Sequence, residues 1–250
     1  MNMLQRFAPS FLLLIVLVAI WELFCRASNI SPTILPAPSA VFFALINSAP
    51  ILLTHTAQTL TETLIGVAIA VALGACVALI LFASPKVRAA IYPLLVLSQT
   101  IPMIALAPLL LIWFGFDLTP KVIIVVLYCF FPIAVALSDA LFNVDQGAVD
   151  LVVGMRASKW QIMRYVRLPA ALPAFFSGLR ISMTYAIAGA IVGEYVGAYR
   201  GLGVFMQTSA NSHATALVFA ALFVTAFLTM ALLGCVYVAE RIFVPWKQYE

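Results

Sequence analysis

Long apolar stretches alternate with short polar segments along the whole chain. Six stretches approach or exceed the roughly 20 residues that cross a bilayer as a helix: residues 11–24, 63–83, 89–116, 121–141, 178–199 and 214–239. A helix satisfies its own backbone hydrogen bonds, as the lipid interior requires. The pattern therefore predicts an all-α, polytopic membrane protein with about six transmembrane helices.

The first apolar stretch, residues 11–24, also has the character of a signal-peptide core. No small-residue cleavage site follows it, because Trp21, Glu22 and Phe24 occupy the region where one would lie. We therefore interpret it as a retained first span with its amino end in the cytoplasm.

The composition agrees with a membrane protein, since 65% of the 250 residues are hydrophobic and 9% are charged. We expect one membrane domain over residues 1–250. The net charge of +4 does not indicate nucleic-acid binding in such a protein; its distribution should instead report the orientation in the membrane. Basic residues are more frequent on the cytoplasmic side of membranes. The six-span topology places ten of the thirteen basic residues inside, together with both termini, and leaves outside only Arg26, Lys121 and Arg200.

Two polar segments are predicted to lie outside the membrane. Residues 27–61 carry Ser, Thr, Asn, Pro and His and should contain one short interfacial helix at 38–47, and residues 200–213 should form an external loop. Glu22, Glu62 and Asp139 lie near predicted span ends, where solvation is the simplest explanation for a charge.

The third predicted span, 89–116, is broken by Pro93, Pro102 and Pro108. Lipid tolerates such breaks where neighbouring protein or a cavity satisfies the freed carbonyl groups. This span is therefore the best candidate to line a path through the membrane. The candidate path residues are Gln99, Thr100, Met103, Tyr128, Tyr185 and Glu194; helix packing is the alternative role for the first five, and an interface contact or a structural hydrogen bond for Glu194.

Charged residues gather in a segment at about 142–177, which the topology places in the cytoplasm. Ser158 followed by Gln161 is a capping box that predicts a helix starting at Lys159. Asp145 can cap an earlier short helix that runs to about Met155. The pattern predicts a helix-turn-helix elbow on the membrane surface.

The second helix of this elbow should carry one apolar face. Trp160, Met163 and Val166 recur at three-residue spacing. We expect Leu168-Pro169 to end the helix, because the residue before a proline disfavours the helical conformation.

The elbow resembles the coupling loop of the permease subunits of ATP-binding-cassette (ABC) importers. The pattern of that loop is Glu-Ala-Ala, three residues, Gly, nine residues, Ile, one residue, Leu-Pro. Asp150 stands at the acidic position, Val166 at the isoleucine and Leu168-Pro169 at the end. Leu151-Val152 replaces the alanine pair and Arg156 replaces the glycine, so we expect Gly154 to take the left-handed turn position instead.

Further segments extend the resemblance over nearly the full chain. WELF at 21–24, ILPAPSAV at 34–41, SQTIPMIALAPLLLIWFGF at 98–116 and LPAALP at 168–173 resemble the branch of these permeases that serves alkanesulfonates, taurine, nitrate and thiamine-precursor pyrimidines. Within this branch, the segment QTIPMIALAPL at 99–109 most resembles the permeases for pyrimidine precursors and so favours a pyrimidine as the solute. Taurine or an alkanesulfonate, nitrate and riboflavin-like solutes are the alternatives.

The resemblance implies the type I importer fold in the bacterial inner membrane and a set of partners. These are cytoplasmic ATPase subunits that hold ATP and Mg²⁺, an external solute-binding protein and a second permease, expected to be a copy of this chain. The residues implied in coupling to the ATPase are Asp150, Gly154, Arg156, Ala157, Ser158, Lys159, Trp160, Met163, Val166, Leu168 and Pro169.

The sequence carries no motif for chemistry of its own. It has no GxxxxGK[ST] loop and no HExxH, and no serine-histidine-acid set stands out. His55 and His213 are single, so we expect no metal site, no cofactor in this chain and no enzymatic activity. For the elbow, the alternative is an interfacial loop that only holds anionic lipid. For the whole protein, the alternatives are an ion-driven secondary transporter and a non-transporting membrane scaffold or enzyme.

Overall fold

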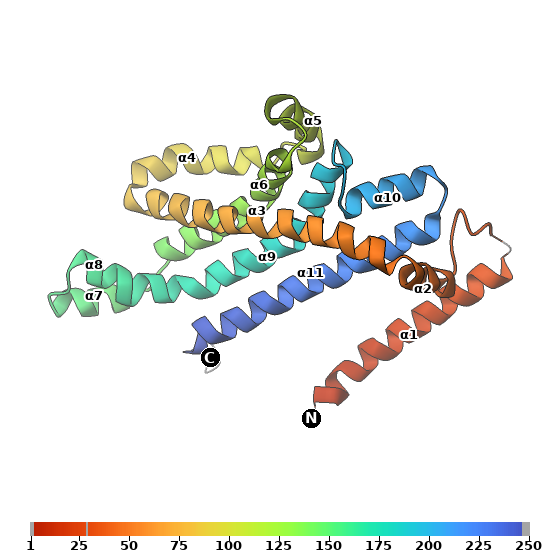
Figure 1. Ribbon diagram of the computed structural model, residues 1–250. Coiled ribbons are helices and arrows are strands. Elements are labelled where there is room, and N and C mark those ends of the chain that lie inside the picture. The colour runs from red at the N-terminus through yellow and green to blue at the C-terminus, as the bar shows by residue number, and fades with distance from the viewer. Residues whose placement is uncertain (1–2, 29, 247–250) are drawn as a thin grey trace.

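A computed structural model describes residues 3–28 and 30–246, and these are helical with no strand among them (Figure 1). The elements in chain order are α1 (Met3–Ala27), α2 (Pro38–Asn47), α3 (Ala49–Ala83), α4 (Pro85–Ser98), α5 (Met103–Phe114), α6 (Leu118–Phe142), α7 (Gln146–Gly154), α8 (Lys159–Ile162), the π-helix η1 (Met163–Arg167), α9 (Leu168–Tyr195), α10 (Leu202–Asn211) and α11 (Thr215–Phe243). The all-α prediction is confirmed.

Four continuous helical segments of the described chain are long and apolar enough to cross a membrane: α3, α6, α11 and the run from α8 through α9. The pair α4–α5 can form a fifth span, broken by a bend of 98°. The break lies at residues 99–102, so the proline-rich third span is interrupted as predicted. The helix α1 contains the first predicted stretch, residues 11–24, but is not among these segments, so four or five of the six predicted spans are found in the described chain.

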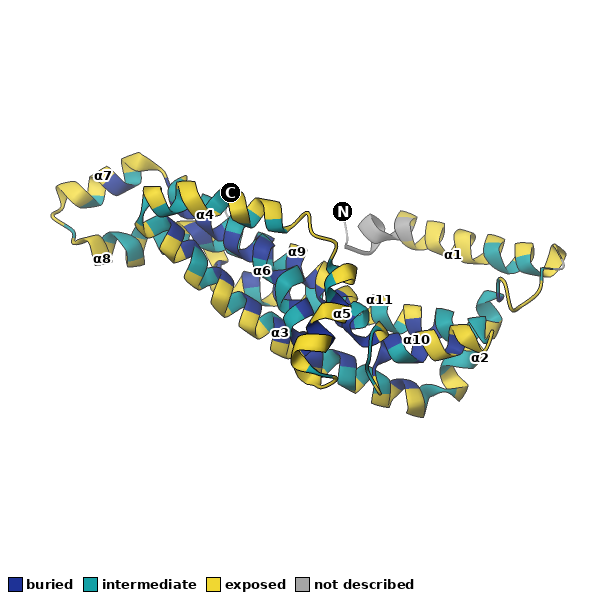
Figure 2. Cartoon of the chain, turned by 90° about the horizontal axis from the view of Figure 1, so that it is seen from above, coloured by how far each residue is buried: buried dark blue, intermediate teal, exposed yellow. Residues whose placement is uncertain are grey.

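The core of the bundle is α6, which packs along both α3 and α9. Glycines allow these helices to approach closely: a Cβ added at Gly66 would lie 2.5 Å from Cβ of Val125, and one at Gly178 would lie 2.5 Å from the carbonyl oxygen of Pro132. Small residues give membrane helices their packing contacts in this way. Buried positions accordingly gather along α6 and α9 (Figure 2).

The helix α1 extends beside the bundle and contacts it through its carboxyl-terminal turns (Figure 2). Trp21 stacks on Phe223 of α11 with ring centroids 6.5 Å apart. The carboxylate of Glu22 accepts hydrogen bonds from the backbone N–H of Ser39, over 3.0 Å, and from its hydroxyl, over 2.8 Å. Glu22 therefore caps the start of α2 rather than being merely solvated.

Several predicted boundaries are wrong. The interfacial helix at 38–47 is confirmed as α2, but α3 already begins at Ala49, so residues 49–61 are not a loop. The fifth span begins at Leu168 rather than at 178, and Leu168-Pro169 does not end a helix, because Pro169 occupies the first turn of α9 after the wider π-helical turn. The predicted external loop 200–213 contains α10, which is packed on α9 and α11.

Candidate functional site

The elbow formed by α7 and α8 projects from one end of the bundle, opposite to α2 and α10 (Figure 1). Both predicted caps are present. The carboxylate of Asp145 accepts from the N–H groups of Gly147 and Ala148, over 3.1 and 3.3 Å. The hydroxyl of Ser158 accepts from the N–H of Gln161 over 3.3 Å, while the Gln161 amide oxygen accepts from the N–H of Ser158 over 2.7 Å.

The turn between the two helices is a Schellman motif centred on Arg156. The N–H of Arg156 donates to the carbonyl of Val153 over 2.8 Å, and the N–H of Ala157 donates to that of Val152 over 3.0 Å. Arg156 has a φ of 61°, the left-handed conformation that glycine adopts at this position in most such motifs. The expectation that Gly154 would take this conformation is wrong, because Gly154 is the last residue of α7.

The predicted apolar face of Trp160, Met163 and Val166 does not form as one surface. Trp160 is 66% exposed, but Met163 is partly buried against the cluster formed by Ala78, Leu137, Leu141 and Ala171. The reason is the π-helix that starts at Met163, since its i→i+5 hydrogen bonds widen the turn and change which residues share a face.

A different set of side chains is exposed on the elbow. Leu151, Met155, Trp160 and Tyr165 are all uncovered, and Asp150 lies beside them at the surface. A hollow of about 290 Å³ lies between α7 and the α8–η1 segment, lined among others by Met155, Tyr165 and Val166. We use the name elbow surface for Leu151, Met155, Trp160 and Tyr165 together with this hollow.

The elbow is attached to the bundle through Arg167. Its guanidinium donates to the carbonyl oxygen of Leu141 over 3.0 Å and lies 4.9 Å from the ring centroid of Phe82. Nearby, Arg88 pairs with Asp139 over 2.7 Å. Asp139 is therefore an ion-pair partner between α4 and α6, while Lys159 and Arg164 remain exposed on the elbow.

Four of the six predicted path residues lie together. Gln99 and Met103, at the break between α4 and α5, line one pocket with Tyr128 of α6 and Tyr185 of α9. Thr100 is not among the lining residues, and its hydroxyl donates to the carbonyl of Leu97 over 2.7 Å.

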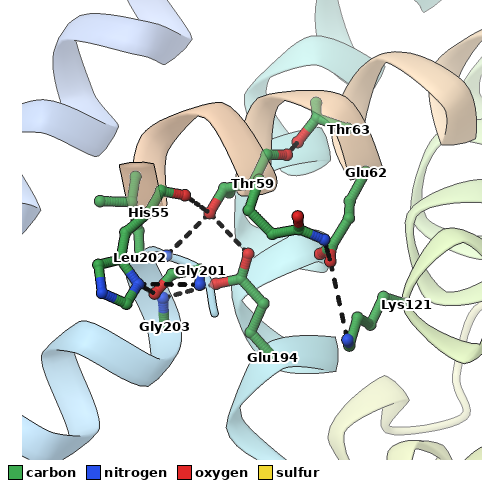
Figure 3. Close-up of polar contacts among 10 residues, drawn as sticks. His55, Thr59, Glu62, Thr63, Lys121, Glu194, Gly201, Leu202 and Gly203 are labelled. Carbon is green, nitrogen blue, oxygen red and sulfur yellow. Dashed lines mark hydrogen bonds and ion pairs between the residues drawn. The ribbon is translucent and has the colours of Figure 1, made fainter. Parts of the chain in front are cut away.

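Glu194 lies elsewhere, in a polar network at the start of α10 (Figure 3). It is 1% exposed. Its Oε1 accepts from the hydroxyl of Thr59 over 2.6 Å and its Oε2 from the N–H of Gly203 over 2.6 Å. Glu194 therefore makes structural hydrogen bonds in this chain, which is one of its two predicted alternative roles. It is not among the described residues that line the pocket of Gln99 and Tyr185.

This network satisfies the first N–H groups of α10, which have no partner within their own helix. The N–H of Gly201 lies 3.0 Å from Nδ1 of His55, and the N–H of Leu202 donates to the Thr59 hydroxyl over 2.8 Å. A carboxylate at a helix amino end also interacts favourably with the helix dipole. His55 and Thr59 come from α3, so α3 and α9 together position α10.

Glu62 extends the network, and the expectation that it is solvated is wrong. Its side chain is fully buried, accepts from the Gln58 amide over 2.8 Å and lies 3.8 Å from Nζ of Lys121. Lys121 is itself buried and is therefore not an external loop charge. The i, i+4, i+7 spacing of His55, Thr59 and Glu62 on one helix face is the available signal, but the predicted boundary at residues 61–63 separates His55 and Thr59 from Glu62.

Comparisons with known proteins agree with this architecture. Residues 66–249 match the family described as "Binding-protein-dependent transport system inner membrane component". The chain is 37% identical over 247 residues to the formylaminopyrimidine transport permease protein ThiX of Halalkalibacterium halodurans, with 98% of both chains covered. It is 34% identical to the riboflavin transport system permease protein RibX of Chloroflexus aurantiacus, covering 94% of this chain and 88% of the relative.

A solved structure shows the same fold. The inward-facing MetNI methionine ABC transporter superposes with a TM-score of 0.69 at 20% sequence identity, over 79% of this chain and 98% of that chain. The fold is that of type I ABC importer transmembrane domains, as predicted. The chain belongs to the binding-protein-dependent transport system inner membrane component family and is the multi-pass permease subunit of an ABC importer.

Proposed function

We propose that this permease imports a thiamine-precursor pyrimidine. The observation that carries the proposal is the 37% identity to a formylaminopyrimidine permease across 98% of both chains, which leaves no segment of appreciable length unmatched. A riboflavin-type solute is the second candidate, because the permease named for riboflavin is 34% identical.

We further propose that the elbow surface docks on a separate ATPase subunit, which holds the ATP and Mg²⁺ and carries out hydrolysis. Leu151, Met155, Trp160 and Tyr165 are large apolar side chains left uncovered at an end of the bundle that also carries the exposed charges Lys159 and Arg164. Exposed apolar groups with a charged rim are typical of protein interfaces. The positive-inside distribution supports a cytoplasmic position for the elbow and both termini.

The complete importer would contain two copies of this permease and an external solute-binding protein. Membership of the binding-protein-dependent transport family supports the external binding protein. In this arrangement alternating access would open the path between the two copies toward one side of the membrane and then the other.

The test is uptake of radiolabelled hydroxymethylpyrimidine, riboflavin and taurine into cells with and without the gene, each with and without ATP depletion. Pyrimidine uptake that requires both the gene and ATP is the expected result. Gene- and ATP-dependent uptake of riboflavin or taurine alone would replace the proposed solute. Uptake that survives ATP depletion and follows the ion gradient would contradict the ATPase partner.

A further inference from the structure

A pocket of about 210 Å³ lies where the α4–α5 break meets α6 and α9. Gln99 and Met103 enter it from the break, Tyr128 and Pro132 from α6, and Tyr185 from α9. Pro132 also lacks the N–H that would bond to the carbonyl of residue 128 in a regular helix. Two proline-disturbed segments thus face each other here, in a membrane-spanning part of the chain.

The polar side chains of the pocket are not engaged by the protein. Across residues 3–28 and 30–246, no hydrogen bond occupies the amide of Gln99 or the hydroxyl groups of Tyr128 and Tyr185. The amide offers two donors and one acceptor, and each hydroxyl can donate or accept. Gln99 and Tyr185 are exposed and Tyr128 is half-buried, so these polar groups are accessible to a ligand that enters the pocket. Three such groups around one pocket can satisfy the donors and acceptors of a polar ligand.

The aromatic side chains define the shape of this ligand. The rings of Tyr128 and Tyr185 are tilted by only 21° with centroids 6.4 Å apart. The absence of a side chain at Gly189 allows the Tyr128 ring to lie against α9, since an added Cβ would be 2.9 Å from its Cδ2. Tyr185 remains 50% exposed and can present its ring to a flat molecule.

Charge and size restrict the ligand further. Among the described residues that line the pocket, none is Lys, Arg, Asp or Glu, so a sulfonate or nitrate anion would find no opposite charge there. The volume of about 210 Å³ lies below the roughly 300–1,000 Å³ of pockets for drug-sized ligands, which favours a small ligand such as one substituted six-membered ring.

We propose that this pocket binds a neutral, planar, single-ring nitrogen heteroaromatic such as an aminopyrimidine. The amide of Gln99 hydrogen-bonds to the ring nitrogen and amino substituent, and the ring of Tyr185 stacks on the ligand. This inference assigns the proposed solute class to a particular pocket. It rests on the proposed function because it takes the pocket to lie on the path of the imported solute.

The test is direct binding of radiolabelled 4-amino-2-methylpyrimidine to the permease–ATPase complex in lipid nanodiscs, without the binding protein. The wild-type complex should bind the probe, and taurine should not compete. Gln99→Leu and Tyr185→Leu should each weaken affinity about tenfold, the loss expected for one hydrogen bond or one stacked ring. Tyr185→Phe, which keeps the ring, should weaken it less than threefold.

Two control variants have matched chemistry outside the pocket. Thr100→Val lies beside Gln99 without lining the pocket, and Tyr237→Leu removes an exposed tyrosine of α11; both should bind as the wild type does. A wild-type complex that does not bind the probe would overturn the proposal. Wild-type affinity in both Gln99→Leu and Tyr185→Leu would overturn it as well.

Uptake into cells separates this proposal from the proposed function. Cells that import labelled pyrimidine equally well with wild-type and Gln99→Leu permease, together with unchanged binding, would contradict the pocket and leave the solute standing. A complex that binds the probe through Gln99 and Tyr185, in cells that accumulate no pyrimidine, would support the pocket and contradict the solute.

Discussion

The hydroxyl of Thr59 on α3 donates a hydrogen bond of 2.6 Å to Oε1 of Glu194 on α9, although 135 positions separate the two residues. The same hydroxyl oxygen accepts the N–H of Leu202 at the start of α10. One threonine side chain thus connects three helices, and the other oxygen of Glu194 completes the connection through Gly203. Changes at these positions should affect the stability of the whole end of the bundle.

Glu194→Gln should destabilise the permease. Both oxygens of Glu194 accept hydrogen bonds, whereas the glutamine amide has one oxygen and one NH₂ group. The NH₂ group would therefore face either the Thr59 hydroxyl or the Gly203 N–H, where an acceptor is needed. A buried donor that loses its acceptor costs about 1–3 kcal/mol, so the thermal unfolding midpoint of the purified complex should fall. Thr61→Val is the control, because Thr61 is exposed and bonds only within its own helix. A midpoint equal to that of the wild type would contradict the capping role.

Gly201→Ala should be more damaging still. Gly201 has a φ of 134°, which disfavours any side chain, and an added Cβ would overlap the carboxyl group of Glu194. We expect a loss of at least about 1–2 kcal/mol, seen as lower yield of folded protein and a lower unfolding midpoint. Gly234→Ala provides the comparison, since an added Cβ there meets open space within α11 and should not lower the midpoint.

Arg156→Gly should stabilise the elbow. The left-handed conformation costs an ordinary residue about 1 kcal/mol and costs glycine little. The thermal midpoint of the permease should rise slightly or remain equal, whereas Gly154→Ala, at a helical position, should have little effect. Co-purification with the ATPase is the second measurement, because the exposed Arg156 side chain lines the elbow hollow. A clear fall in the midpoint would show that the arginine side chain stabilises the turn.

Trp160 and Met163 should respond in opposite ways. Trp160→Glu alters an exposed side chain, so ATPase co-purification should decrease while the unfolding midpoint stays the same. Met163→Ala removes packing against the buried cluster that includes Leu141 and Ala171, so the free energy of unfolding should fall by about 1–3 kcal/mol and the midpoint should decrease. Unchanged co-purification of Trp160→Glu would contradict the docking role of the elbow surface.

Local signals in the sequence predicted much of the fold. The capping box at Ser158, the cap at Asp145 and the helix at 38–47 depend on residues within a few positions of each other, and all three are confirmed. The proline-broken third span also follows from sequence.

The errors arise where a long-range contact determines the role of a polar residue. His55 and Thr59 lie in the segment 27–61 that the sequence predicts to be external, and Glu62 lies near a predicted span end. In the structure His55 and Thr59 contact the start of α10, whereas Glu62 pairs with Lys121 in the interior. The sequence carries no capping signal for α10, because the start of this helix has no side-chain cap of its own and relies on α3 and α9. The inward position of Met163 is not predictable either, because a π-helical turn leaves no reliable mark in the sequence.

The π-helical turn at Met163–Arg167 has a mechanical consequence. Because the backbone does not break at Leu168-Pro169, the helical segment Lys159–Tyr195 is one rod of 37 residues that connects the elbow to Glu194. At 1.5 Å per residue its length is about 55 Å. A tilt of about 5° imposed at the elbow would displace the opposite end of such a lever by about 5 Å. Because Glu194 lies at that end and accepts the N–H of Gly203, the rod links the elbow directly to the polar network that positions α10.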